Sequence, residues 1–219
     1  MTDTTRARTI GALFLISTIA YLTGSGLVDA VINKPAFLAE LDPGRMQVMA
    51  GLLLEILNAA AVTAIAVLVY PILKSNSESI ALGYLSSRII ESVLLLAAII
   101  GPLTLLGLSE SFIAAGGDAD GYYKTIGDAL VRGEDLAFQL AMLALSVGSI
   151  LFCILLYRTK LVPRLLSLLG ALGYIALLAS SCLTICGYDP GMALFIPGGL
   201  FELILPLWLI FKGWNKRNQ

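Results

Sequence analysis

The sequence predicts an all-α fold, a six-helix transmembrane bundle that forms a single integral membrane domain over residues 1–219. Hydrophobic residues make up 58% of the chain, charged residues only 13%, and the mean hydropathy is +0.90. Soluble domains are about half apolar and about one quarter charged. The apolar residues also fall into six stretches, and each is close to the roughly 20 residues that a helix needs to cross a bilayer.

The six predicted spans are separated by charged or Gly/Pro-rich breaks. The first is interpreted as a retained span and not as a signal peptide, because its apolar run is long and lacks a clear small-residue cleavage site. Residues 109–135 are predicted to form a solvated linker with a short interfacial helix that ends at Leu130. The predicted spans are 9–32, 48–73, 81–108, 136–156, 165–186 and 193–211.

The basic residues predict the orientation of the bundle. Short cytoplasmic loops retain Lys and Arg, so the side with more of them is expected to face the cytoplasm. Nine lie in the ends and connections on one side, four lie on the other, and Arg88 is inside a span. Both termini are therefore predicted to be cytoplasmic, in a multi-pass protein of the bacterial inner (plasma) membrane. The nine are Arg6, Arg8, Lys74, Arg158, Lys160, Arg164, Lys212, Lys216 and Arg217.

The composition also excludes several functions. The net charge of −1 argues against nucleic-acid binding, which depends on a basic surface. The chain has no histidine, which excludes enzymes that depend on histidine as a base or as a metal ligand. The three cysteines lie in apolar segments without metal-ligand spacing. No metal and no cofactor is predicted.

Four charged residues fall deep inside the predicted spans, namely Glu55, Arg88, Glu91 and Glu202. A charge at the centre of a membrane helix costs about 2.5–3.5 kcal/mol, so these side chains are expected to face the bundle interior and to converge. Polar neighbours on the same helix faces extend this site. Pro206 cannot donate to the carbonyl of Glu202, which predicts a kink there. The candidate intramembrane polar site consists of Glu55, Asn58, Arg88, Glu91, Gln139 and Glu202.

The charge balance of this site leaves two readings open. One arginine can neutralise one glutamate, so two carboxyl groups lack a cation inside the spans and at least one is a candidate proton carrier. Alternatively, Arg88 bridges helices through Glu91 or Glu55, and the remaining glutamate serves only as a hydrogen-bond donor. Arg88 then has a structural role.

Two spans share a short pattern that suggests an internal repeat. A glycine precedes a glutamate by four residues in Gly51-Leu-Leu-Leu-Glu55 and in Gly198-Gly-Leu-Phe-Glu202, which places both on one helix face. The fourth span is preceded by Gly133-Glu-Asp135. Three helical hairpins of common origin are one explanation of this pattern.

A set of short motifs runs along nearly the whole chain. They are Gly51 to Asn58, Tyr70-Pro71, Ala81-Leu-Gly-Tyr84, Arg88-Ile-Ile-Glu91, Tyr157-Arg158, Leu161-Val-Pro163-Arg164, Gly199-Leu-Phe-Glu202 and Lys212-Gly213. With these motifs the chain resembles domain of unknown function family 4386, a bacterial family of polytopic membrane proteins. The resemblance is strongest around Arg88 to Glu91 and around Glu202, and it implies a membrane bundle and no established activity.

Three functions follow from these observations, and the first is favoured. It is a small ion- or proton-coupled carrier, or a pore, built around the Glu/Arg cluster. The second is a non-transporting module that binds a lipid, a hydrophobic ligand or a membrane partner, with a homodimer as one such assembly. The third and least favoured is an intramembrane enzyme that uses paired glutamates as acid and base. The lipid bilayer is the partner that all three require.

Overall fold

The computed structural model describes residues 3–117 and 121–215 and confirms the prediction of an all-helical bundle. Within these residues there is no strand, and six segments are long and apolar enough to cross a membrane. The elements are α1 (Asp3–Ile32), α2 (Phe37–Glu40), α3 (Arg45–Lys74), α4 (Glu78–Ala98), α5 (Ile100–Ala114), α6 (Tyr122–Thr159), α7 (Arg164–Ile185), η1 (Met192–Phe195) and α8 (Ile196–Phe211).

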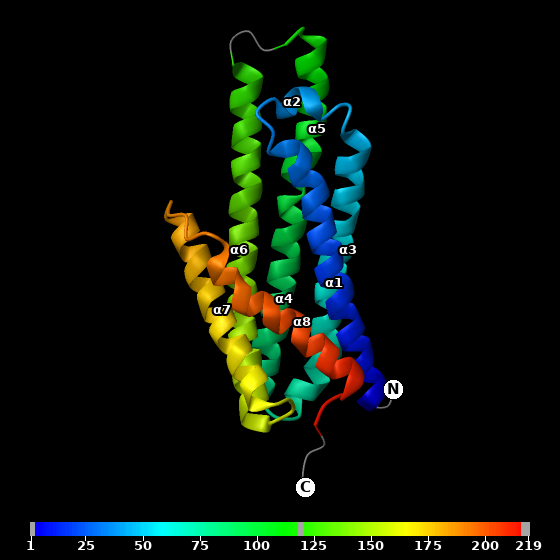
Figure 1. Cartoon of the computed structure of the whole chain (residues 1–219), viewed down its shortest axis with the longest axis vertical. Helices are drawn as coiled ribbons and strands as arrows, with labels where there is room; N and C mark the ends of the chain where they lie inside the picture. Colours follow the sequence, from blue (N-terminus) through cyan, green and yellow to red (C-terminus); the bar gives the residue numbers. More distant parts are fainter. Residues whose placement is uncertain (1–2, 118–120, 216–219) are drawn as a thin grey trace.

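The long helices form a closed ring in chain order. Helix α1 packs on α3, α3 on α4, α4 on α6, α6 on α7 and α7 on α8, and α8 returns to pack on α1. Helix α8 crosses the bundle at a steep tilt (Figure 1). We call the end where α1 begins and α8 ends the terminal end, and the opposite end, which carries α2, the distal end. In a ring of this kind every helix has a face toward the interior, and the polar residues of the candidate site lie on these faces.

The helices differ in length, so the bundle has two parts. Helix α7 has 22 residues and the η1–α8 segment 20, which correspond to about 30 Å, the thickness of a hydrocarbon core. Helix α6 has 38 residues, or about 57 Å. The other long helices therefore continue past α7 and α8 at the distal end, as Figure 1 shows.

Each part has its own apolar core. The core at the terminal end joins all six helices of the ring and includes Phe14, Leu73, Phe152 and Leu209. The core at the distal end joins α1, α2, α3 and α5, with partly buried side chains of α6 against it, and includes Val28, Leu38, Leu52 and Leu105. The interior between these two cores is where the polar groups lie.

The prediction of a solvated linker over 109–135 is wrong for most of its length. Helix α5 continues to Ala114, and α6 begins at Tyr122 as one helix with the predicted fourth span. The physical reason is burial: Tyr123, Leu130 and Val131 pack against the distal core. The predicted interfacial helix is therefore the first part of α6. Residues 118–120 lie outside the described part of the chain.

The predicted third span is one apolar segment that is interrupted at Ile99, between α4 and α5. Pro102 has no N–H group to donate to the carbonyl of Ala98, which explains the interruption. By contrast, α8 runs from Ile196 to Phe211 as one helix that includes Pro206, so the helix is not interrupted at that proline.

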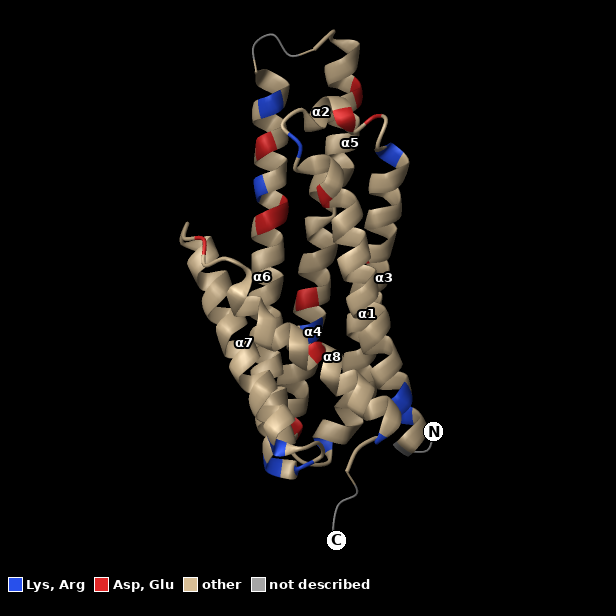
Figure 2. Cartoon of the chain, viewed as in Figure 1, with Lys and Arg blue, Asp and Glu red and all other residues tan. Residues whose placement is uncertain are grey.

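Charged residues are unevenly distributed between the two ends. Lys and Arg gather at the terminal end, whereas the distal end carries both signs (Figure 2). Exposed ion pairs join Lys34 to Glu40 and Arg45 to Glu110 at the distal end. This distribution is the one from which the cytoplasmic position of the termini is predicted, and the orientation remains a prediction.

Candidate functional site

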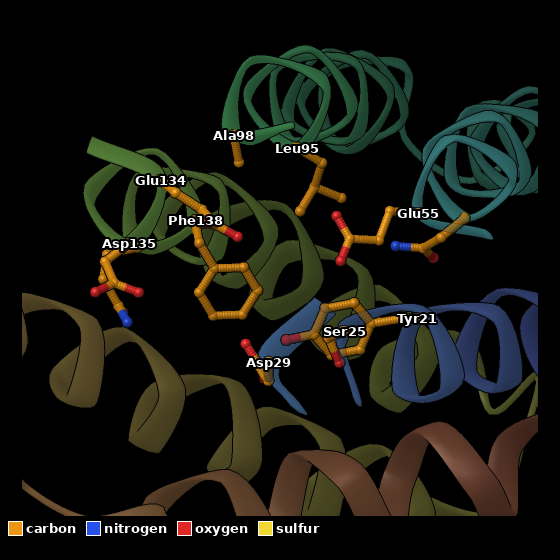
Figure 3. A pocket seen from close by; sticks show the side chains of 11 residues that line it. Tyr21, Ser25, Asp29, Glu55, Leu95, Ala98, Glu134, Asp135 and Phe138 are labelled. Carbon is orange, nitrogen blue, oxygen red and sulfur yellow. The ribbon is translucent and has the colours of Figure 1, made fainter. Parts of the chain in front are cut away.

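A cavity of about 230 Å³ lies inside the ring, between α1, α3, α4 and α6. Four carboxylic acids from three helices line it, and no lysine or arginine is among its lining residues. Figure 3 shows these side chains around a common space. The lining residues are Tyr21, Ser25, Asp29, Glu55, Asn58, Leu95, Ala98, Glu134, Asp135, Phe138 and Gln139.

The carboxyl groups lie at different depths. Asp29 and Asp135 are exposed, whereas Glu134 and Glu55 are only partly exposed. Glu55 lies ten residues after the distal start of α3 at Arg45, so it is about 15 Å along that helix. The cavity therefore leads from an exposed acidic rim to an acidic floor inside the apolar part of the bundle.

Close packing of α1 on α3 places Glu55 at the floor. A Cβ atom on Gly24 would lie 2.8 Å from the carbonyl oxygen of Gly51, and one on Gly51 would lie 2.7 Å from the carbonyl oxygen of Gly24. Only glycine allows this approach. The same added atom on Gly24 would lie 3.1 Å from Cγ of Glu55, so the missing side chain makes room for the glutamate.

Polar and aromatic side chains complete the floor. The hydroxyl of Ser17 donates to Oδ1 of Asn58 at 2.5 Å, which ties α1 to α3 below Glu55. The rings of Tyr21 and Phe138 stack with centroids 5.8 Å apart and planes at 3°, and they join α1 to α6. Oε1 of Gln139 is buried and has no hydrogen-bond partner within the described part of the chain.

A second polar cluster lies closer to the terminal end. Arg88 and Glu91 are only 4% and 3% exposed, and Nη1 of Arg88 donates to Oε2 of Glu91 at 2.8 Å. The guanidinium also lies 5.9 Å from the ring centroid of Tyr84, within cation–π range. On α4, Glu91 precedes Leu95 of the cavity wall by one turn, which is about 6 Å.

Glu202 belongs to this second cluster. The hydroxyl of Tyr174 donates to Oε1 of Glu202 at 2.9 Å, and Glu202 interacts electrostatically with both Arg88 and Glu91. A glycine crossing again lies one turn from the glutamate, since a Cβ on Gly173 would come within 2.6 Å of Cα of Gly198. The α7–α8 crossing is thus tight at Gly173, whereas a Cβ on Gly198 would lie 3.7 Å from the nearest atom of Gly173, unlike the crossing of α1 and α3, which is tight at both glycines.

The family comparison covers almost the entire chain. The family model described as "Domain of unknown function (DUF4386)" matches residues 9–213. The chain belongs to the DUF4386 family. No curated protein and no solved structure matches it. Together with the six apolar helices, this makes the DUF4386 chain a multi-pass membrane protein.

The six predicted site residues of this DUF4386 protein fall into two groups. Glu55, Asn58 and Gln139 line the cavity, whereas Arg88, Glu91 and Glu202 form the deeper cluster. The expected single cluster is therefore divided, because the Glu55 side chain faces the cavity. Of the two partners considered for Arg88, Glu91 forms the ion pair, and it lies three residues later on the same helix.

The predicted site of this DUF4386 protein contains only three of the eleven residues that line the cavity, and only one of its four acids. Asp29 falls within the predicted first span and has no predicted role, and Glu134 and Asp135 fall in the predicted linker. The missed signal was helical spacing, since Glu134 and Asp135 precede Phe138 and Gln139 by four residues each. If the fourth span is extended toward its N-terminus, Asp135 falls on the helix face of Gln139 and Glu134 on that of Phe138.

Proposed function

We propose that this protein is a small carrier or pore that conducts protons, located in the inner (plasma) membrane, whose permeation route begins at the acidic cavity. One observation carries the proposal: four carboxyl groups line a cavity that ends at Glu55, within an apolar span and without a basic neighbour in its wall. A carboxyl group at that depth is costly, so a fixed functional use is the simplest reason for it.

The asymmetry of the interior supports the same function. The cavity occupies the distal side of the ring, whereas an apolar core with Phe14, Leu73 and Phe152 fills the terminal end. A carrier exposes its site to one side at a time. The next polar groups toward the terminal end are the Arg88–Glu91 pair, with Glu202 and Tyr174, which adjoin that core.

Proton flux into proteoliposomes tests the proposal. The purified protein is reconstituted into vesicles that contain a pH-sensitive dye, and a potassium diffusion potential, negative inside, drives protons inward. We expect internal acidification several-fold faster than in protein-free vesicles, and we expect Glu55→Gln to return the rate to the protein-free value. The matched control is Glu78→Gln, because Glu78 is exposed at the terminal end and pairs with Lys74.

Two results would overturn the carrier. The first is a wild-type rate equal to that of protein-free vesicles, and the second is a Glu55→Gln rate equal to wild type. The first result would favour a non-transporting membrane module, in which the buried Arg88–Glu91 pair only fixes helix packing. The complete burial of the Arg88–Glu91 pair supports this alternative, because a permeation route does not require that burial.

A further inference from the structure

The lining of the cavity indicates the chemistry of its ligand. Hydrogen-bond acceptors dominate it, since the acids Asp29, Glu55, Glu134 and Asp135 are joined by the unpartnered amide oxygen of Gln139. A buried acceptor without a donor costs about 1–3 kcal/mol. Oε1 of Gln139 has almost no accessible surface, so a ligand that turned this amide toward the cavity and donated to it would remove that cost. The amide oxygen is independent of the carboxyl groups and points to the same property, a ligand with N–H or O–H donors.

The arrangement of the acids does not suit a metal ion. Calcium takes six to eight oxygens at about 2.3–2.6 Å. No group of three or more acidic, cysteine or histidine side chains in the described residues has a spacing that could hold a metal. The acids lie instead at different depths around a space of about 230 Å³, which is large enough for a polyatomic ligand.

The aromatic pair supplies an apolar surface within the same cavity. Tyr21 and Phe138 stack across the gap between α1 and α6, beside Glu55 in Figure 3. Aromatic faces attract ammonium groups and also pack against apolar substituents. Leu95 adds a further apolar contact.

We propose that the cavity binds a small organic cation with N–H donors, namely a primary or secondary ammonium that carries an apolar substituent. The inference rests on the proposed function, because it names the class of solute that the carrier would accept at the same site. The ammonium group lies among Glu55, Glu134 and Gln139, and its substituent packs on Tyr21 and Phe138.

Thermal unfolding of the detergent-purified protein with matched probes tests this binding. The probe is 2-phenylethylammonium, and it is compared with neutral 2-phenylethanol, with the quaternary trimethyl(2-phenylethyl)ammonium and with Ca²⁺. Tryptophan fluorescence reports unfolding, since Trp208 and Trp214 are not among the cavity residues. We expect 2-phenylethylammonium to raise the unfolding temperature by about 3 °C, more than any of the other three.

Variants locate the effect in the cavity. Glu55→Gln and Gln139→Leu should each remove most of the shift that 2-phenylethylammonium causes, whereas Glu78→Gln should keep it. The ligand comparison on the wild-type protein remains decisive if either variant fails to fold. An equal shift with 2-phenylethanol, a larger shift with Ca²⁺, or no shift with the amine would each overturn the inference.

The two proposals fail separately. Proton flux in vesicles without an amine shift in detergent would overturn the ligand class and leave the carrier intact. An amine shift that Glu55→Gln removes, without flux in vesicles, would overturn the carrier and leave an amine-binding membrane protein.

Discussion

At the scale of single residues, glutamates inside the spans lie in two different environments in this protein. Glu91 is buried against Arg88 and is not among the residues that line the cavity. Glu55 has no cationic partner in the wall that it shares with three other acids. The sequence predicts that both are intramembrane carboxylates, because depth follows from position along a span. The i,i+3 spacing on α4 allows Arg88 to pair with Glu91. Whether Glu55 competes for Arg88 cannot be predicted, because that depends on how α3 and α4 are rotated.

We expect the Arg88–Glu91 pair to stabilise the protein because each buried charge neutralises the other. Arg88→Met should destabilise the protein by about 3–5 kcal/mol, because it leaves Glu91 buried without a cation. The double change Arg88→Met with Glu91→Leu should recover most of that loss. Unfolding in a mixed-micelle titration measures both. A single variant as stable as the wild type would contradict the structural role of the pair.

At the scale of helices, glycine crossings set where the glutamates lie. Gly24 meets Gly51 between α1 and α3, and Gly173 meets Gly198 between α7 and α8. In each case a glutamate follows one turn later on the returning helix, at Glu55 and Glu202. The Gly-to-Glu spacing on α3 and α8 could be predicted from the sequence. The partner glycines on α1 and α7 could not, because their recognition requires the helix pairing.

A matched pair of glycine variants tests the first crossing. Gly24→Ala should destabilise the protein by about 1–3 kcal/mol and displace Glu55, since the added Cβ meets the backbone of Gly51. Gly26→Ala on the same helix should be neutral or slightly stabilising, because nothing lies within 4 Å of its added Cβ. Unfolding titrations of the two variants measure the difference, and equal stabilities would argue against a tight crossing at Gly24.

At the scale of the whole molecule, hydropathy predicts the six spans but not the shape of the bundle. Apolar length is a local property, so the span count follows from sequence. The distal part was missed because the first fourteen residues of α6 are polar on average, although Tyr123, Leu130 and Val131 pack on the distal core. The burial of these three side chains depends on α2 and α5, and hydropathy does not predict where those two helices lie. The rim of the cavity lies in this same part of the chain.

The orientation of the bundle decides from which side the cavity fills. We expect the terminal end to be cytoplasmic, because its connections carry most of the Lys and Arg residues. The cavity then opens toward the outside. Single-cysteine variants in a background without Cys153, Cys182 and Cys186 test this orientation.

Two exposed positions suit the labelling, Ala115 after α5 at the distal end and Ser75 after α3 at the terminal end. In spheroplasts, a membrane-impermeant maleimide should label Ala115→Cys at once, whereas Ser75→Cys should react only after lysis. The opposite pattern would place the termini outside. The acidic cavity would then face the cytoplasm, and a solute carried from it would move in the export direction.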